Sequence, residues 1–327
     1  MTRIAIVGPG RMGRGMAHAF LHAGFEVALL DVKPREASEA ATALAAARDE
    51  VAHGIEVMRG IGRLDAAQAA AMLARLSLAA GAAADTALAR ADVVFEAVPE
   101  VMEQKQAAFA RISAHAGASV PIASTTSTFD IEALAQFVTF PARFLNTHWL
   151  NPAFLIPLVE VSPGAGTDEA VLTRMEALLR EAGKVAVRCK AAPGFIVPRI
   201  QALAMNEAAR IVTEGVATPD AVDTAIRSGF GPRLAVLGLL EFVDYGGGDI
   251  LYYAANYLRE ALAAPRFEPP PVIVDNMHEG RIGPRTGEGF YDWRGRDMDA
   301  YRRQTFAKLA DLFDHLGLLA PPRGGNG

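Results

Sequence analysis

The chain has 327 residues, of which 51% are hydrophobic and 21% are charged, so it is long enough for two ordinary domains with apolar cores of their own. Its formal charge of -5 and its scattered arginines lack the basic excess of a nucleic-acid-binding protein, so we expect no nucleic-acid partner. No apolar run reaches the roughly 18 uninterrupted residues of a membrane-spanning helix. We therefore expect no membrane partner either.

Cysteine and histidine usage argues against a metal site. The single cysteine, Cys189, excludes an internal disulfide and a cysteine-ligated metal, and we assign it to ordinary packing. His18 and His22 lie four residues apart, a spacing found in metal sites, but no third ligand accompanies them. We therefore expect no metal. The strand-like RIAIVG begins at Arg3 without the charged and long apolar regions of a secretory signal, so we expect a cytoplasmic protein.

The first predicted elements are a strand, a glycine turn, a helix and a second strand within residues 3–31. Three glycines match G-x-G-x-x-G where the strand meets the helix, a place where the backbone must turn tightly and approach a pyrophosphate. The N–H groups and the positive dipole end of the helix then face the phosphates. This pattern predicts a dinucleotide site, with a purely structural turn as the alternative. The residues assigned to the site are Gly8, Gly10, Arg11, Met12 and Gly13.

Asp31 closes the second strand, eighteen residues after Gly13. A carboxylate in that position can accept hydrogen bonds from ribose hydroxyls and would repel a 2′-phosphate, which favours NAD over NADP. Lys33 and Arg35 are close enough in sequence to weaken this preference. A turn or helix-capping role is the alternative interpretation of Asp31.

Residues 34–90 are rich in alanine, with breaks at Gly54, at 60–62 and at Gly81. Larger apolar residues still recur at helical spacing, so we predict a folded helical hairpin inserted beside the sheet. Three strands follow, in ADVVFEAVPE, SVPIASTTS and RFLNTHWL. Ligands gather at the carboxyl ends of strands in an open α/β sheet, and Glu100, Ser127 and His148 fall at such ends.

The apolar run HWLNPAFLIPLVEV carries two ionisable groups, His148 and Glu160. Buried ionisable groups need partners, so we expect these two to pair. An imidazole with a pKa near the working pH can take the proton of an alcohol while hydride leaves for a nicotinamide. A carboxylate on the other ring nitrogen fixes the tautomer and stabilises the imidazolium. A hydrogen-bonded core histidine is the alternative.

Strand signals stop after PGFIVPR. We predict helices over 195–214, 219–228, 235–262 and 298–316, with APRFEPPPV as a connection. The expected fold class is therefore α/β, with a Rossmann-type doubly wound NAD-binding domain over 1–190 and an all-helical substrate and dimerisation domain over 191–327. The boundary is expected near 191–194. The helices carry more apolar surface than one small layer covers, so we expect a homodimer through this domain.

Six ordered motifs resemble the 3-hydroxyacyl-CoA dehydrogenase family nearly end to end: GPGRMGRGMA, FEAVPE, ASTTS, HWLNPAFLIPLVEV, PGFIVPR and GRIGPRTGEGFYDW. The resemblance implies an NAD-dependent oxidoreductase that interconverts L-3-hydroxyacyl and 3-oxoacyl compounds. It implies that His148 is the catalytic acid/base and that Glu160 orients it.

The resemblance also assigns residues around this pair. Ser127 is expected to contact the substrate oxygen, and Asn151 of the H-x-x-N-P motif is assigned to the substrate site. Glu100 and Lys105 are expected beside the nicotinamide end of the cofactor.

The chain departs from the family at Pro198, where P-G-F-I-x-N-R members have an asparagine that helps hold the substrate near the histidine. Proline has neither a side-chain donor nor a backbone N–H, but it is tolerated in the first turn of a helix. We therefore expect the fold to survive while the substrate contact changes. Gln201, one turn further along, is a candidate replacement.

The carrier of the substrate stays open. NPAFLIPLVEV and GFGPRLAVLG are more similar to the branch that oxidises small free hydroxy acids, such as gulonate and carnitine dehydrogenases. In gulonate-type members an arginine that matches Arg233 meets the substrate carboxylate, a task suited to a planar guanidinium, whereas an exposed helix-start arginine is the alternative. DYGGGD and the helical hairpin, with Arg48, Arg59 and Arg63 available for CoA phosphates, resemble the acyl-CoA enzymes.

The sequence thus leads to a 3-hydroxyacyl substrate as the first hypothesis. A small free hydroxy acid or an unusual ring alcohol is the alternative within the enzyme class. An inactive dinucleotide-binding protein is the alternative from a different class.

Overall fold

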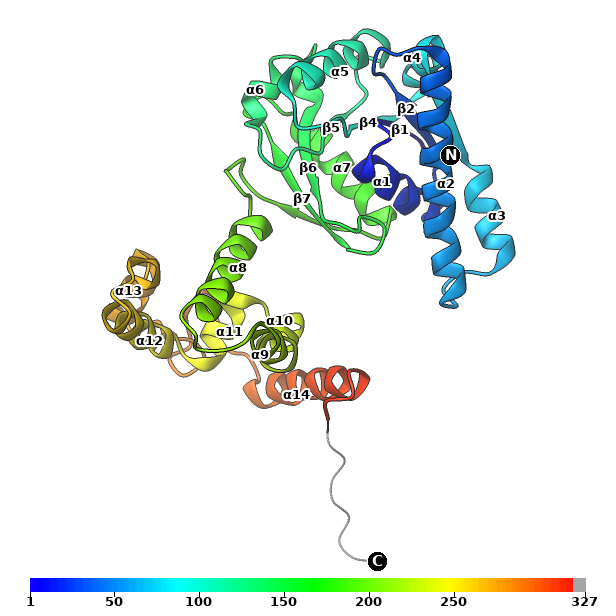
Figure 1. Cartoon of the computed structure of the whole chain (residues 1–327). Coiled ribbons are helices and arrows are strands. Elements are labelled where there is room, and N and C mark those ends of the chain that lie inside the picture. The colour runs from blue at the N-terminus through cyan, green and yellow to red at the C-terminus, as the bar shows by residue number, and fades with distance from the viewer. Residues whose placement is uncertain (320–327) are drawn as a thin grey trace, which may run out of the picture. The chain divides into compact units, whose positions relative to one another are not determined.

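The computed structural model describes residues 1–319, which divide into two compact units, Met1–Leu203 and the described part of Ala204–Gly327 (Figure 1). The first unit is built on one eight-stranded sheet with the strand order β3-β2-β1-β4-β5-β6-β7-β8. All neighbouring strands are parallel except β6 and β7, which are antiparallel. The strands are β1 (Arg3–Val7), β2 (Glu26–Asp31), β3 (Leu76–Ala80), β4 (Val93–Glu96), β5 (Ile122–Ser124), β6 (Phe144–Trp149), β7 (Leu158–Pro163) and β8 (Val185–Arg188).

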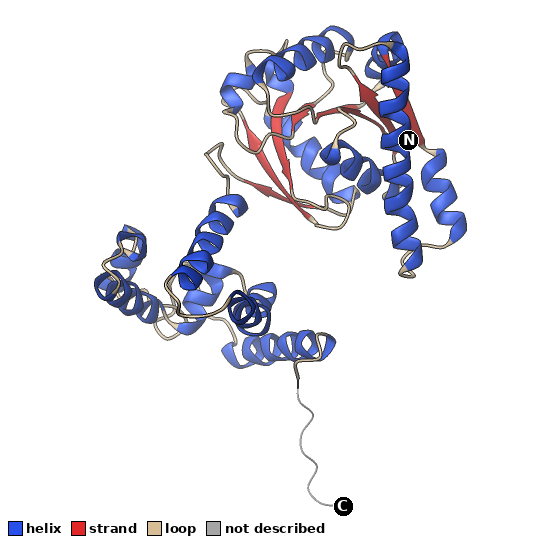
Figure 2. Ribbon diagram, in the orientation of Figure 1, coloured by secondary structure: helices blue, strands red, loops and turns tan. Residues whose placement is uncertain are grey.

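Helices cover both faces of this sheet (Figure 2). Successive side chains of a strand point to opposite faces, so Ile4 and Ile6 of β1 enter one core while Ala5 and Val7 enter the other. The resulting unit is the predicted doubly wound α/β fold. Its helices are α1 (Arg11–His22), α2 (Ala37–Gly60), α3 (Ala66–Ala74), α4 (Gly81–Arg90), α5 (Met102–His115), α6 (Ile131–Ala135), α7 (Glu169–Glu181) and the first part of α8 (Val197–Thr213), with a short 3-10 turn at Pro141–Arg143.

The described part of the second unit is helical, as predicted. Besides the rest of α8 it contains α9 (Pro219–Ala225), a π-helical turn (Ile226–Phe230), α10 (Gly231–Val236), α11 (Leu239–Gly246), α12 (Gly248–Ala261), a 3-10 turn (Pro265–Phe267), α13 (Pro271–His278) and α14 (Met298–His315). Within residues 1–319, every helix falls short of the length and apolar character that crossing a bilayer requires.

Two details of the predicted elements are wrong. The continuous helix expected over 235–262 is three helices, because Leu237 is extended and Gly247 has a φ of 103°, which few residues other than glycine adopt. The stretch 34–90 is not helical throughout, because residues 76–80 form β3 along β2. The expected hairpin itself is present as α2 and α3.

A buried carboxylate organises the late motif GRIGPRTGEGFYDW. Asp244 on α11 accepts hydrogen bonds from the backbone N–H groups of Phe290 and Tyr291 and from the indole of Trp293, each at 2.9 Å. A side chain at Gly289 would collide with this carboxylate. The motif is therefore explained by packing within the second unit.

Candidate active site

The glycine turn between β1 and α1 brings three backbone segments close together. Gly8 has a φ of 113°, and a Cβ there would lie 2.6 Å from the carbonyl oxygen of Ala97. A Cβ at Gly13 would collide with the carbonyl oxygen of Gly8, whereas Gly10 faces open space. Only glycine fits at positions 8 and 13. Gly10 leaves the N-terminus of α1 uncovered for a ligand.

A cleft of about 1140 Å³ runs from this turn across the carboxyl ends of the strands. Most of the predicted site residues of the first unit line it: Gly8, Gly10, Arg11, Met12, Asp31, Glu100, Ser127, His148, Asn151, Pro198 and Gln201. Gly13 packs beneath the turn instead. Lys105 is 1% exposed and belongs to a buried network behind the cleft wall.

Asp31 lies at the cleft end of β2 and is 3% exposed. One carboxylate oxygen accepts a hydrogen bond from the backbone N–H of Lys33 at 3.1 Å. The other oxygen lies 2.9 Å from Nε of Arg35. Both basic residues line the same cleft, and the guanidinium of Arg35 pairs with the carboxylate there.

His148 and Glu160 face each other across the antiparallel pair β6 and β7, as cross-strand partners in the register. His148 Nδ1 lies 2.7 Å from Glu160 Oε2. Glu160 is fully buried, while His148 is 6% exposed and lines the cleft. The hydrogen bond at Nδ1 leaves Nε2 as the ring nitrogen available to a ligand.

The second carboxylate oxygen of Glu160 is also occupied. Oε1 accepts hydrogen bonds from the backbone N–H groups of Ile196 and Val197, at 2.9 and 2.8 Å, where α8 begins. The positive end of the helix dipole stabilises a negative charge in that place. Phe195 stacks on the His148 ring with centroids 5.3 Å apart, so both members of the pair are held from two sides.

The loop between β6 and β7 is held by a buried lysine. Lys184 donates hydrogen bonds to the backbone carbonyls of Ala153 and Ile156, at 2.7 and 2.9 Å, and its ammonium lies 5.6 Å from the ring centroid of Trp149. Burial lowers the pKa of Lys184. This side chain fixes the connection between the two strands that carry the histidine and the glutamate.

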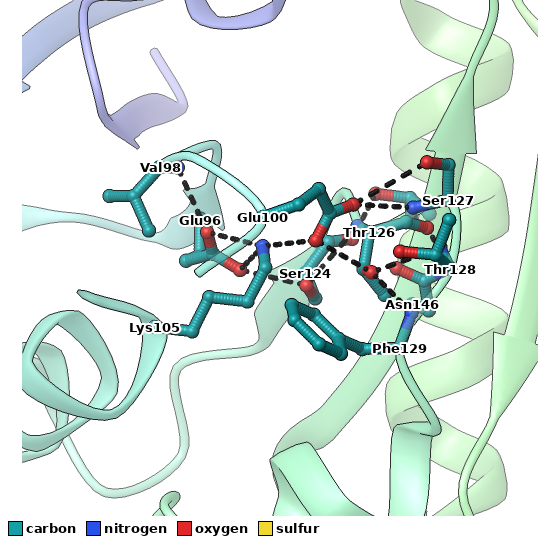
Figure 3. A network of polar contacts seen from close by, with 11 residues as sticks. Glu96, Val98, Glu100, Lys105, Ser124, Thr126, Ser127, Thr128, Phe129 and Asn146 are labelled. Carbon is teal, nitrogen blue, oxygen red and sulfur yellow. Dashed lines mark hydrogen bonds and ion pairs between the residues drawn. The ribbon is translucent and has the colours of Figure 1, made fainter. Parts of the chain in front are cut away.

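Glu100 binds the segment that carries Ser127 (Figure 3). Its carboxylate accepts hydrogen bonds from the backbone N–H of Ser127 at 2.8 Å and from Oγ1 of Thr126 at 3.0 Å. The hydroxyl of Ser127 lies 3.5 Å from the same carboxylate and lines the cleft. Glu100 is thus occupied by protein partners at the edge of the site.

The arginines considered for substrate anions differ in their surroundings. In the second unit, Arg233 on α10 donates to the carbonyl of Gly229 at 2.7 Å and stacks over Phe242. On the hairpin, Arg59 pairs with Glu56. The remaining two, Arg48 and Arg63, are exposed.

Sequence reasoning missed several residues that shape this site: Glu96, Lys184, Phe195 and the backbone N–H groups of Ile196 and Val197. Glu96 had one available signal, an acid at the end of an apolar strand. The other contacts join segments far apart in the chain, so the motif PGFIVPR, which contains Phe195, Ile196 and Val197, gave no sign of their partners. No group of three or more metal-ligating side chains occurs among residues 1–319.

Comparisons with known proteins show that this chain is similar to dehydrogenases. Residues 3–192 match the model for the NAD binding domain of 3-hydroxyacyl-CoA dehydrogenase, and residues 194–293 match the model for its C-terminal domain. The chain is 32% identical to a 3-hydroxybutyryl-CoA dehydrogenase of Bradyrhizobium diazoefficiens, over 90% of this chain and 96% of the relative.

Two further similarities cover nearly the whole chain. The 5-formyl-3-hydroxy-2-methylpyridine 4-carboxylate 5-dehydrogenase of Mesorhizobium japonicum is 29% identical, over 94% of this chain and 96% of the relative. Among solved structures, a 3-hydroxyacyl-CoA dehydrogenase of Archaeoglobus fulgidus superposes with a TM-score of 0.76 at 29% identity, covering 98% of this chain and 100% of that one.

Proposed function

Because the chain belongs to the 3-hydroxyacyl-CoA dehydrogenase family, we propose that this NAD-dependent dehydrogenase interconverts an L-3-hydroxyacyl and a 3-oxoacyl compound with His148 and Glu160 as its acid/base dyad. The observation that carries the proposal is the 2.7 Å contact between His148 and Glu160, with the imidazole on the wall of the cleft that also contains the glycine turn.

The residues around the glycine turn fit NAD. Gly10 leaves space at the N-terminus of α1 for a pyrophosphate, and Asp31 offers a carboxylate to a ribose. Arg11 and Met12 line the same part of the cleft. When bound, NAD supplies the acceptor for the hydride.

The proton is handled by the dyad. With Nδ1 hydrogen-bonded to Glu160, Nε2 of His148 accepts the proton of the substrate hydroxyl. The imidazolium that forms is stabilised by the carboxylate, which is itself held by the N–H groups at the start of α8. The hydroxyl of Ser127 donates a hydrogen bond to the substrate oxygen and keeps that oxygen near the imidazole. In the reverse direction His148 returns the proton.

Substitution of the dyad tests the proposal. We expect His148→Gln to lower kcat by about 10² to 10⁴, the usual contribution of a general base, while the Kd for NADH stays at the wild-type value. Glu160→Gln should lower kcat as well, because the imidazolium loses its counter-charge. His53→Gln, at an exposed position on α2, is the matched control. Wild-type turnover in His148→Gln would refute the proposed role.

The second candidate is a dehydrogenase for a small free hydroxy acid or a ring alcohol. Pro198 favours it, because a proline lines the cleft where acyl-CoA members carry an asparagine. The relative named for a pyridine carboxylate is consistent with such a substrate. Gln201 lines the same cleft and is the proposed replacement contact, and Asn151 is proposed to bind substrate beside it.

A substrate screen separates the two candidates. NAD reduction is measured with 3-hydroxybutyryl-CoA and with free 3-hydroxy acids and ring alcohols, for the wild type and for Arg233→Ala. For an acyl-CoA enzyme we expect turnover of the thioester and little effect of the substitution. For a free-acid enzyme we expect Arg233→Ala to raise KM at least about tenfold, because the substrate carboxylate loses a charged partner.

We also propose that the chain forms a homodimer through its second unit. The support is the exposed apolar face of α12, where Ile250, Tyr253 and Tyr257 recur at helical spacing with exposed fractions of 62%, 60% and 70%. Apolar surface of this kind is normally covered by another protein surface.

A further inference from the structure

Behind the cleft wall, a buried lysine lies between two glutamates (Figure 3). The ammonium of Lys105 lies 3.0 and 3.1 Å from the two carboxylate oxygens of Glu96 and 3.4 Å from Oε2 of Glu100. Glu96 is fully buried and also accepts hydrogen bonds from the N–H of Val98 at 2.9 Å and from the hydroxyl of Ser124 at 2.7 Å. Burial raises the pKa of Glu96, and Lys105 and Ser124 oppose this effect.

Neither Glu96 nor Lys105 lines the cleft. A buried ion pair is weak evidence for a stabilising role, because the loss of hydration offsets much of the attraction between the charges. The arrangement therefore calls for an explanation other than stability. The geometry provides such an explanation, because hydrogen bonds and an ion pair connect both residues to the segment that carries Ser127.

Two routes lead from these side chains to that segment, in addition to the backbone hydrogen bond from the N–H of Thr125 to the carbonyl of Glu96 at 3.0 Å. In the first, Lys105 holds Glu100, which accepts hydrogen bonds from the N–H of Ser127 and the hydroxyl of Thr126. In the second, the hydroxyl of Ser124 donates to Glu96 and accepts from the N–H of Thr126 at 3.3 Å.

Further hydrogen bonds, within the segment and from β6, centre on Thr126. Its hydroxyl oxygen accepts hydrogen bonds from the N–H groups of Thr128 and Phe129, at 3.3 and 2.9 Å, and its carbonyl accepts one from the side-chain amide of Asn146. Displacement of Thr126 would therefore move the whole turn, Ser127 included.

We propose that Glu96 and Lys105 are positioning residues, which hold Glu100 and Ser124 and through them fix the Thr126–Ser127 backbone at the cleft. Glu96 takes up most of the ammonium's hydrogen-bonding capacity, so Glu100 remains directed at the Ser127 N–H. Without the charge of Glu96, Lys105 draws Glu100 inward and releases that N–H. The functional consequence rests on the proposed role of Ser127, whereas the structural consequence does not.

Amide hydrogen exchange on the ligand-free protein tests the structural consequence. Glu96→Gln keeps the size of the side chain and removes its charge. We expect exchange at the amides of 126–129 to become about tenfold faster, as the weakening of one hydrogen bond to a charged group would produce. Exchange in α2 should remain at the wild-type rate, because α2 carries no residue of the network and packs mainly on α1, α3, β2 and β3.

If Glu96→Gln does not fold because the buried charge of Lys105 has lost its partner, a second variant replaces it. Glu96→Gln with Lys105→Met removes both charges and leaves no unpaired buried ion. We expect faster exchange at 126–129 in this variant too, because Glu100 loses the ammonium that holds it beside the Ser127 N–H. Glu176→Gln, which breaks a surface pair with Arg188 in the same unit, is the matched control. Folded variants whose exchange at 126–129 equals that of the wild type would overturn the proposal.

Kinetics test the functional consequence through a double-mutant cycle. We expect Glu96→Gln to lower kcat about tenfold in the wild-type background and hardly at all in a Ser127→Ala background, with KM for NAD little changed. An equal loss in both backgrounds would mean that Glu96 acts elsewhere and would contradict the proposal. If Ser127→Ala itself has wild-type kcat, the role of Ser127 is refuted, and hydrogen exchange alone decides the positioning role.

Discussion

His18 is a buried histidine that the dyad does not use. It lies on α1, and its ring stacks on Phe154 with centroids 4.3 Å apart. Burial lowers the pKa of His18 from 6.5 to about 4, and the charges of His22 and Lys184 act in the same direction. His18 is 3% exposed, so its ring packs in the interior of the first unit.

The shifted pKa of His18 predicts a pH-dependent stability. Between pH 6.5 and 4, His18 is protonated in the unfolded state but neutral in the folded state. The free energy of unfolding therefore falls as the pH drops through this window. From pH 7 to pH 5 the loss from this one group is up to about 2 kcal/mol. Denaturant unfolding measures it, and we expect His18→Phe, which keeps the ring, to lose less stability than the wild type. Equal losses in both proteins would contradict this account.

At the scale of elements, the antiparallel pair β6 and β7 brings His148 and Glu160 into contact. Twelve residues separate His148 from Glu160, and the hairpin register places them directly opposite each other. Lys184 ties down the connection between the strands by hydrogen bonds to its carbonyl oxygens. A one-residue slip in this register would turn the glutamate to the opposite face of the sheet.

Lys184 therefore offers a test at this scale. Lys184→Met keeps the length of the side chain but leaves buried carbonyls without a donor, which we expect to lower the free energy of unfolding by about 2 to 4 kcal/mol. Turnover should fall as well, because the loop borders the cleft. Lys190→Met, at an exposed position nearby, is the control for removal of a charge. A Lys184→Met protein as stable as the wild type would show that the loop needs no such anchor.

The elements also show where sequence patterns were sufficient. The apolar runs that end at Asp31, Glu96 and Trp149 predict strands, because fully buried parallel strands have few polar residues. β3 was missed, because LSLAA lies in an alanine-rich stretch without a clear period. It becomes a strand only because the edge of β2 offers unpaired backbone groups.

At the scale of the whole molecule, the proposed dimer predicts how the chain behaves in solution. We expect a particle of twice the chain mass by light scattering at micromolar concentration. Ile250→Asp with Tyr257→Asp places two charges on the exposed face of α12 and should give monomers. Lys308→Glu, at an exposed position on α14, should leave the dimer intact. A monomeric wild type, or a charged double variant that still dimerises, would rule out an interface on this face.

The sequence by itself determined the glycine turn, the acid that follows it, the helical second unit and the identity of the histidine and glutamate, because each depends on residue types at short spacing. Only the tertiary structure decided how these groups are supported. Glu160 accepts hydrogen bonds from two backbone N–H groups that lie 36 and 37 positions later in the sequence. Glu96 accepts one from the hydroxyl of Ser124, 28 positions later. Such contacts form when packed strands and helices bring distant backbone together, and no local pattern in the chain encodes their geometry.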